Sequence, residues 1–306
     1  MKRMAWRLLP AVALILATTA PTVSQEPTDS VPTQHLVVVS IDGLRPDAID
    51  KFGLKTLQRL MDEGSYTLEA QTIYPSKTLP SHTSMLTGQT PDGHGIAFNS
   101  GNPDHGVVAV PTIFELARAG GLHTAGFFSK AKFRHLDRAD AYDYRQAPSS
   151  NADNWMATQT VPDAIQYLRR NRPNLIFVHI GEPDYAGHGA GWMSYIYGLA
   201  TRRADGAVAR ILEAAEDAYG AGNFTVMVTS DHGGHGRSHG TDDPRDMTIP
   251  WIVWGKGVDQ GATLDGVRIM DTAATALWLL GVEAPGAFHG RLVHAAFTRV
   301  LAGADR

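Results

Sequence analysis

The strongest constraint on the fold is a series of short, predominantly apolar segments that alternate with amphipathic helical patterns. The apolar segments are expected to be strands at residues 35–41, 123–128, 175–180, 224–229 and 249–254. The helical patterns cover residues 54–63, 112–119, 162–170, 195–219 and 271–280. A strand that is apolar throughout must be covered on both faces, and helices between strands allow parallel neighbours. The sequence therefore predicts an α/β fold with a largely parallel central sheet and helices on both faces.

Carboxylates follow three of these expected strands. Asp42 ends the first, Asp184 comes shortly after residues 175–180, and Asp231 comes after residues 224–229. In such a sheet the carboxyl ends of the strands share one edge, where ligands bind. Three carboxylates about 4 Å apart would repel each other by several kcal/mol per pair at an effective dielectric of about 20. Because His188 and His232 stand beside them, the sequence predicts a shared site for zinc or manganese.

Composition narrows the class of protein. The 306 residues are 43% hydrophobic and 19% charged, which is typical of a globular chain, and we expect a single domain over residues 35–306. A formal charge of −4 argues against a protein that coats nucleic acids. The sequence contains no cysteine, which excludes disulfides and thiol catalysis.

The first residues have the layout of a secretory signal. A basic start, residues 1–7, precedes an apolar run at residues 8–20 and a polar stretch at residues 21–34. The run is shorter than the roughly 20 residues of a membrane-spanning helix. We predict that residues 1–24 are a signal, that the protein is exported to the periplasm or secreted, and that no stable membrane span remains. A buried amphipathic helix is the alternative, but the run lacks helical periodicity.

Two segments interrupt the alternation of strands and helices. Residues 138–160 are polar and have no clear period, which predicts either a long loop or a small cap over the site. Residues 102–110 are expected to form another loop.

Hydroxyl side chains precede a helix-like segment near residue 78. At such a position Thr78 is either a helix cap, which accepts a backbone N–H, or a nucleophile beside an anion site. Three imidazoles that follow Asp231 are candidate ligands: His232, His235 and His239. His289 is a more distant rival, and Ser81 is the fallback nucleophile. His82, His94 and His105 are interpreted as turn residues or supports behind the ligands.

Six motifs in a fixed order resemble the alkaline phosphatase superfamily, most closely its type I phosphodiesterase and nucleotide pyrophosphatase branch. The resemblance covers nearly everything from His35 to Val293 and implies a three-layer sandwich like that of alkaline phosphatase. The motifs are Asp42-Gly43, Lys77 to His82, Pro91 to Ile96, Glu182 to Asp184 with Gly187-His188, Asp231 to Gly233, and His239-Gly240.

The resemblance implies two divalent metal ions, with zinc favoured, and a role for each matching residue. Two such ions would turn three negative charges into a net charge of about +1, which attracts phosphate. Thr78 would be the nucleophile and would form a phosphothreonine intermediate. The implied ligands of one metal are Asp184, His188 and His239, and those of the other are Asp42, Thr78, Asp231 and His232.

Three further residues receive substrate roles from the resemblance. Asn99 would donate its amide to a phosphoryl oxygen, although a loop Asn is often only a turn residue. Lys130 and Lys132 resemble the paired basic residues with which phosphonoacetate hydrolases and threonine-type alkaline phosphatases bind a second charge on the substrate. The alternative for this pair is a solvated basic helix end.

The expected substrate is a small phosphate ester, with a phosphodiester or pyrophosphate favoured. Only six residues separate His232 from His239, where nucleotide pyrophosphatases carry a long insertion that helps to build a nucleoside pocket. A phosphomonoesterase or a phosphonoacetate-hydrolase-like enzyme is therefore the next hypothesis. A sulfatase is disfavoured because Thr78 lies in no C/S-x-P-S-R pattern. A non-catalytic metal-binding protein would be expected to have lost a ligand or the nucleophile, yet all seven positions are filled.

Overall fold

The computed structural model describes residues 32–150 and 154–304 of the chain. The predicted signal, residues 1–24, lies outside the described residues. Within the described part, no helix has both the length and the apolar character needed to cross a membrane.

The described strands form one eight-stranded sheet in the order β4-β3-β5-β1-β6-β7-β2-β8. Neighbours from β4 through β6 run parallel, whereas β7 is antiparallel to both β6 and β2. This confirms a largely parallel sheet. The strands are β1 (Leu36–Ile41), β2 (Ser65–Gln71), β3 (Thr124–Phe127), β4 (Tyr144–Gln146), β5 (Leu175–Ile180), β6 (Thr225–Thr229), β7 (Thr248–Gly255) and β8 (Ala262–Thr263).

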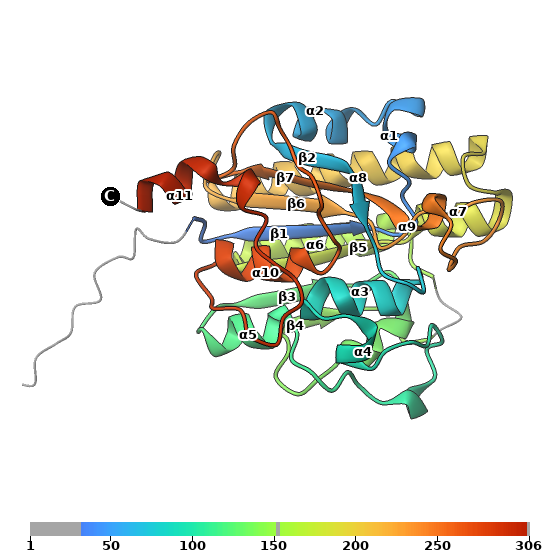
Figure 1. The fold of residues 1–306 in the computed structure, drawn as a ribbon, viewed down its shortest axis with the longest axis horizontal. Coiled ribbons are helices and arrows are strands. Elements are labelled where there is room, and N and C mark those ends of the chain that lie inside the picture. Colours follow the sequence, from blue (N-terminus) through green and yellow to red (C-terminus); the bar gives the residue numbers. More distant parts are fainter. Residues whose placement is uncertain (1–31, 151–153, 305–306) are drawn as a thin grey trace, which may run out of the picture.

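Helices cover both faces of this sheet, which confirms the three-layer α/β architecture (Figure 1). Side chains of α1, α2, α6 and α8 pack into one hydrophobic core, and those of α3, α5 and α10 pack into the other. The α-helices are α1 (Asp47–Lys51), α2 (Lys55–Glu63), α3 (Thr78–Thr87), α4 (Pro91–His94), α5 (Ile113–Ala119), α6 (Ala157–Asn171), α7 (Glu182–Ala190), α8 (Tyr195–Tyr219), α9 (Pro244–Met247), α10 (Asp271–Leu279) and α11 (Thr298–Ala304). Short 3₁₀ helices are η1 (Pro103–His105), η2 (Ala131–Leu136) and η3 (His294–Ala296).

Strand β1 shows why the apolar segments need two covering layers. Val37 and Val39 point into the core shared with α2, α6 and α8, and Leu36 and Val38 point into the opposite core. All six residues of β1 are buried. Alternation of side chains across a strand therefore requires every residue of this central strand to be apolar or paired.

The structure adds elements that the apolar pattern did not predict. Strand β2 alternates buried and partly exposed residues, so it lacks the continuous apolar run of a central strand. Strand β4 and the start of α6 at Ala157 both lie inside residues 138–160, where a loop or cap was expected. A cap role for this segment stays a prediction.

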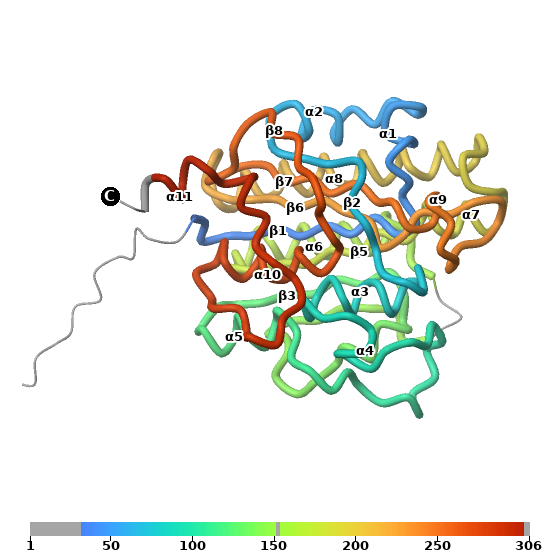
Figure 2. Tube along the Cα trace, in the orientation of Figure 1, coloured from blue at the N-terminus to red at the C-terminus, as the bar shows by residue number. Residues whose placement is uncertain are grey.

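Helices α7 and α9 lie together at one end of the sheet, on the right in Figure 1, and α11 lies at the opposite end. The blue-green trace in Figure 2 passes from β2, on one side of β1 in this view, to α3 on the other. Segments far apart in sequence therefore meet around the central strands.

Candidate metal centre

The end of the sheet near α7 gathers the predicted ligands from separate parts of the chain. Asp42 follows β1, Asp231 and His232 follow β6, and α7 carries Asp184 and His188 one turn apart. His239 comes from the loop between β6 and α9. These side chains form two groups that share Asp184, and the ligand atoms within each group lie within 4.8 Å of one another. The groups are Asp184, His188 and His239, and Asp42, Asp184 and His232.

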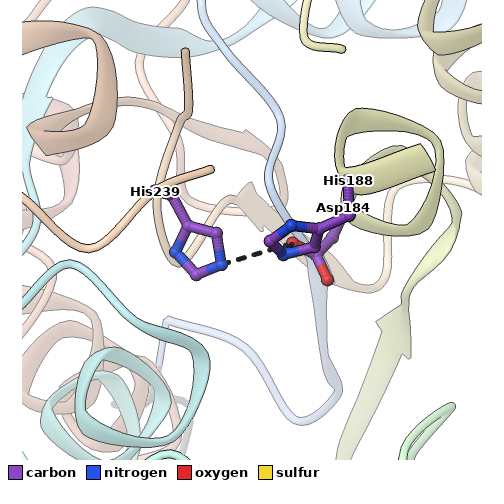
Figure 3. Close-up of side chains that lie close together, drawn as sticks. All are labelled: Asp184, His188 and His239. Carbon is purple, nitrogen blue, oxygen red and sulfur yellow. Dashed lines mark ion pairs between the residues drawn. The ribbon is translucent and has the colours of Figure 1, made fainter. Parts of the chain in front are cut away.

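The first group is centred on one oxygen of Asp184. Nε2 of His188 lies 3.3 Å from Oδ1 of Asp184, and Nε2 of His239 lies 3.6 Å from the same oxygen. Figure 3 shows the ring of His239 directed from its loop toward Asp184 and His188, which project together from α7. Two imidazole nitrogens and one carboxylate oxygen thus face a common point.

Nε2 of His232, a member of the second group, also approaches Asp231, which lies beside that group. This nitrogen lies 3.2 Å from Oδ2 of Asp231 and 3.4 Å from Oδ1 of Asp42. All three side chains are fully buried. Short distances thus link six of the seven predicted ligands: Asp42, Asp184, His188, Asp231, His232 and His239.

Several of these ligand atoms are buried without a hydrogen-bond partner among the described residues. A buried polar atom without a partner is costly, so a cluster of them needs an explanation. A bound cation would supply what these lone pairs lack. The atoms are Oδ1 of Asp42, Oγ1 of Thr78, Oδ1 of Asp184, Oδ2 of Asp231 and Nε2 of His232.

The three histidines are oriented so that Nε2 of each offers a lone pair. Nδ1 of His188 lies 3.0 Å from the backbone carbonyl of Arg237. Nδ1 of His232 lies 2.8 Å from the carbonyl of Gly233, and Nδ1 of His239 lies 2.8 Å from the carbonyl of Ser76. A carbonyl can only accept, so Nδ1 carries the proton in each ring. Backbone contacts of this kind fix the tautomer and ring orientation of metal-binding histidines. The donor set therefore fits divalent cations.

The carboxylates of this site are held in the charged form. Burial alone would raise the pKa of Asp42, but the ammonium of Lys130 and a hydrogen bond from His179 keep it well below its usual range. The pKa of Asp184 is also lowered, because Lys130 and His188 outweigh burial and the nearby charge of Asp42. Burial lowers the pKa of His239 to about 4, so its ring is neutral near pH 7. Anionic oxygens and neutral imidazoles are the forms that bind metal.

Lys130 and His179 contact Oδ2 atoms of these carboxylates, whereas Oδ1 of Asp42 and of Asp184 has no hydrogen-bond partner among the described residues. Nζ of Lys130 lies 2.5 Å from Oδ2 of Asp42 and 2.6 Å from Oδ2 of Asp184. Nε2 of His179 lies 2.9 Å from Oδ2 of Asp42, and its Nδ1 lies 2.7 Å from Oγ of Ser129. Lys130 is 5% exposed, so it is not a solvated basic helix end.

Thr78 is the first residue of α3 and is almost fully buried. His82, one turn along the helix, has Nδ1 2.8 Å from the carbonyl of Thr78 and 3.3 Å from Oδ2 of Asp231. Nε2 of His82 pairs with Oγ of Ser40 at 2.8 Å. His82 thus ties the start of α3 to β1 and to Asp231, which agrees with its interpretation as a support.

The side chains of Asn99 and Lys132 are in contact next to the start of α3, where Thr78 lies. Oδ1 of Asn99 accepts from the backbone N–H of Leu79 at 3.0 Å and from Nζ of Lys132 at 3.1 Å. Burial, with the nearby charge of Lys130, lowers the pKa of Lys132 to about 8. A cavity of about 460 Å³ adjoins the site and is lined by Lys130, Lys132, Asn154, Asp184, Tyr185 and His188, among others.

The rival residues lie in other contacts. Nδ1 of His235 is 2.7 Å from Oδ1 of Asp246, and Nδ1 of His289 accepts from the backbone N–H of Thr90. Oγ of Ser81 accepts from Thr72. His94 pairs with Ser84, and the ring of His105 packs against Phe98.

Sequence reasoning did not single out His179 or Asp246. His179 is the one polar residue in the otherwise apolar β5, and that interruption was a usable signal. Asp246 is fully buried and accepts from Thr241 as well as contacting His235, so it shapes the loop that carries His239. A run of Asp residues at positions 242, 243 and 246 gave no hint of which one is buried.

Solved structures with this arrangement of sheet and helices belong to the alkaline-phosphatase-like α/β class. Murine ectonucleotide pyrophosphatase/phosphodiesterase 5, solved in complex with AMP, superposes with a TM-score of 0.71 at 16% identity, covering 82% of this chain and 96% of that one. A 2-O GAG sulfatase superposes with a TM-score of 0.72 at 15% identity, covering 87% and 74%. At these identities the likeness concerns the fold alone.

Residues 36–241 match the family described as type I phosphodiesterase / nucleotide pyrophosphatase. The chain belongs to this family, which confirms the resemblance found in the motifs and agrees with the prediction of a hydrolase. Human ectonucleotide pyrophosphatase/phosphodiesterase family member 1 is 25% identical over 222 residues, 66% of this chain but only 24% of that protein. The bis(5'-adenosyl)-triphosphatase of Xenopus laevis is 37% identical over 75 residues, 24% of this chain and 16% of that protein. The chain thus spans about a quarter or less of the length of these relatives.

Proposed function

We propose that this protein is a two-metal phosphoester hydrolase that cleaves phosphodiester or pyrophosphate bonds through a phosphothreonine intermediate. The observation that carries the proposal is the cluster of five buried, unpartnered ligand atoms from Asp42, Thr78, Asp184, Asp231 and His232. Membership of the phosphodiesterase family supports the reaction class.

The proposed ligands divide into the two sets expected from the sequence. Asp184, His188 and His239 would hold one cation, and Asp42, Thr78, Asp231 and His232 the other. The mixed oxygen and nitrogen donors without thiolate suit zinc or manganese, and the family resemblance favours zinc. A pair of divalent cations, when bound, neutralises the carboxylates, lowers the pKa of a hydroxyl nucleophile and stabilises a leaving oxygen.

The chain's own groups would then place the reacting atoms. Thr78 presents a buried hydroxyl at the start of α3, where the positive end of the helix dipole favours a phosphate. Oδ1 of Asn99 is occupied by Leu79 and Lys132, which leaves its NH₂ group to donate to a phosphoryl oxygen. In-line attack by the deprotonated hydroxyl of Thr78 would form the bond from Oγ1 to phosphorus as the bond to the leaving group breaks. Attack by water would then cleave the phosphothreonine, release the phosphate product and restore the hydroxyl.

Lys132 is the better candidate for contact with substrate of the two predicted lysines. Both line the adjoining cavity, but the ammonium of Lys130 is engaged by two carboxylates, whereas that of Lys132 has a neutral amide partner. The short spacing between His232 and His239 supports a compact leaving group rather than a deep nucleoside pocket. A phosphomonoester remains the second candidate, because a cation beside the site suits an additional negative charge.

Hydrolysis of bis-p-nitrophenyl phosphate and of p-nitrophenyl phosphate, measured beside metal analysis of the same sample, tests the proposal. We expect faster turnover of the diester and two cations per chain. Faster turnover of the monoester would favour a phosphomonoesterase. Bound cations without turnover of either ester would indicate a metal-binding protein.

We further propose that the protein is exported and that residues 1–24 are removed. The basic start and the short apolar run support this location. N-terminal sequencing of the mature protein from the culture medium or periplasm tests it, and an intact start at Met1 would contradict it.

A further inference from the structure

The ammonium of Lys130 lies inside the protein between two carboxylates. It is 5% exposed, and Nζ contacts Oδ2 of Asp42 at 2.5 Å and Oδ2 of Asp184 at 2.6 Å. An ammonium has three N–H donors, so these two contacts use most of its capacity. The ring of Tyr185, with its centroid 5.1 Å from Nζ, covers another side. Little of Lys130 is left to meet a substrate.

The two oxygens of each aspartate are in different situations. Oδ2 of Asp42 and Oδ2 of Asp184 are bonded to Lys130, and Oδ2 of Asp42 also contacts His179. Oδ1 of both residues is buried and has no hydrogen-bond partner among the described residues. Oδ1 of Asp42 approaches His232, and Oδ1 of Asp184 approaches His188 and His239. The bonded oxygens thus face Lys130 and the free oxygens face the ligand groups.

We propose that Lys130 is a positioning residue that clamps Oδ2 of Asp42 and Asp184 together, turns Oδ1 of each toward the two cation sites, and holds the site assembled before metal binds. This role rests on the proposed two-metal function. It differs from the substrate contact that the sequence suggested for Lys130, because the clamp acts on the protein alone.

The charges explain why such a clamp is needed. Three buried carboxylates, Asp42, Asp184 and Asp231, lie close together, and without cations they would repel each other and lack solvation. One buried ammonium shared by two of them offsets part of this cost. Removing one partner of a buried ion pair is strongly destabilising because it leaves uncompensated charge. Lys130 therefore stabilises the metal-free state most of all.

Lys132 provides a matched control in the same segment. Lys132 lies on η2, two residues after Lys130, and is half-buried. Its Nζ donates a hydrogen bond to the neutral Oδ1 of Asn99 at 3.1 Å. Methionine at either position keeps an unbranched side chain that is one atom shorter and removes the charge. The two variants thus separate loss of the clamp from loss of any buried ammonium near the site.

The test compares Lys130→Met, Lys130→Gln and Lys132→Met with the wild-type chain in three measurements. The first is the melting temperature in chelator. The second is the visible absorption of added Co²⁺, which reports ligand geometry. The third is kcat and KM on bis-p-nitrophenyl phosphate with metal restored.

We expect Lys130→Met to lower the melting temperature in chelator by roughly 10 °C, to shift the Co²⁺ bands, and to lower kcat with KM little changed. Lys132→Met should melt within a few degrees of the wild type, keep its Co²⁺ bands and raise KM. If Lys130→Met folds only after Co²⁺ is added, the clamp is supported, and Lys130→Gln then supplies the melting comparison.

A wild-type melting temperature and Co²⁺ spectrum in both Lys130 variants, with a raised KM, would overturn the clamp and return Lys130 to substrate binding. The clamp would also be overturned if the Lys130 variants and Lys132→Met all stayed unfolded, both with and without Co²⁺. If the wild-type chain takes up no cation, the proposed function fails, yet the melting comparison in chelator still decides whether Lys130 joins the two aspartates.

Discussion

Nε2 of His232 lies 3.2 Å from Oδ2 of its neighbour Asp231, and neither atom has a hydrogen-bond partner within the described part of the chain. The other polar atoms of the pair are occupied. Oδ1 of Asp231 accepts from the backbone N–H of Gly43 and of His232, and Nδ1 of His232 donates to the carbonyl of Gly233. Oδ2 of Asp231 and Nε2 of His232 are thus two neighbouring acceptors without donors, and a bound cation would satisfy both.

Metal removal should lower both activity and stability. A ligand that binds only the folded state at about 1,000 times its Kd stabilises that state by about 4 kcal/mol. For a chain of this size we expect chelator to lower the melting temperature by about 10 °C and to abolish ester hydrolysis. Calorimetry with and without chelator, followed by readdition of Zn²⁺, measures both effects. An enzyme that ignores chelator would contradict the two-metal assignment.

Replacing Thr78 should remove the chemistry and leave the metals. Thr78→Ala deletes the proposed nucleophile, so turnover should fall by at least about a thousandfold. Because carboxylates and imidazoles supply the other ligands, metal content should stay near that of the wild type. Ser81→Ala is the control, since Ser81 contacts Thr72 and should leave turnover close to normal. An active Thr78→Ala beside an inactive Ser81→Ala would transfer the nucleophile role to Ser81.

His239 and His235 give opposite expectations for metal binding. Nε2 of His239 is 3.6 Å from Oδ1 of Asp184, whereas His235 is turned to Asp246. We expect His239→Ala to bind one cation per chain instead of two and His235→Ala to keep both. Metal analysis after exhaustive dialysis distinguishes them. Loss of a cation in His235→Ala alone would mean that the wrong histidine has been assigned.

Much of the fold and the candidate site could be predicted because both follow from local patterns. Predominantly apolar runs marked β1, β5 and β6, and their parallel register brings Asp42 and Asp231 to the same end of the sheet. Ser40 pairs in register with His179, so Asp42 comes next to Ile180 and close to α7. The order of these chemical groups along the sequence was enough to expect a common site.

The rest depended on contacts between distant side chains, which a sequence pattern does not encode. Strand β2 escaped prediction because only one of its faces is well buried, so its side chains alternate. The direction of β7 depends on its pairing with β6 and β2, not on its composition. Lys130 stands in a motif that resembles a substrate-binding pair, and only the packing of η2 against the site brings its ammonium to two aspartates.

His94 should make the fold sensitive to acid. Its Nδ1 accepts from the backbone N–H of Ile96, its Nε2 pairs with Ser84, and burial lowers its pKa from 6.5 to about 4. A group whose pKa is depressed by folding stabilises the fold above its unfolded pKa and loses that contribution as the pH falls. As the pH falls from about 6.5 to about 4, protonation of His94 in the unfolded chain should lower the free energy of unfolding by about 3 kcal/mol.

Urea unfolding at a series of pH values measures this contribution, with His94→Gln as the comparison. Glutamine does not titrate, so the variant should lose less stability between neutral and acid pH than the wild type does. Equal losses in the two proteins would show that acid acts through other groups.

The central claim is that distant side chains converge on a pair of divalent cations, and anomalous X-ray diffraction from crystals grown with Zn²⁺ tests it most directly. We predict two anomalous peaks, one among Asp184, His188 and His239 and the other among Asp42, Asp231 and His232. A single peak, or peaks elsewhere on the molecule with these side chains bare, would contradict the account.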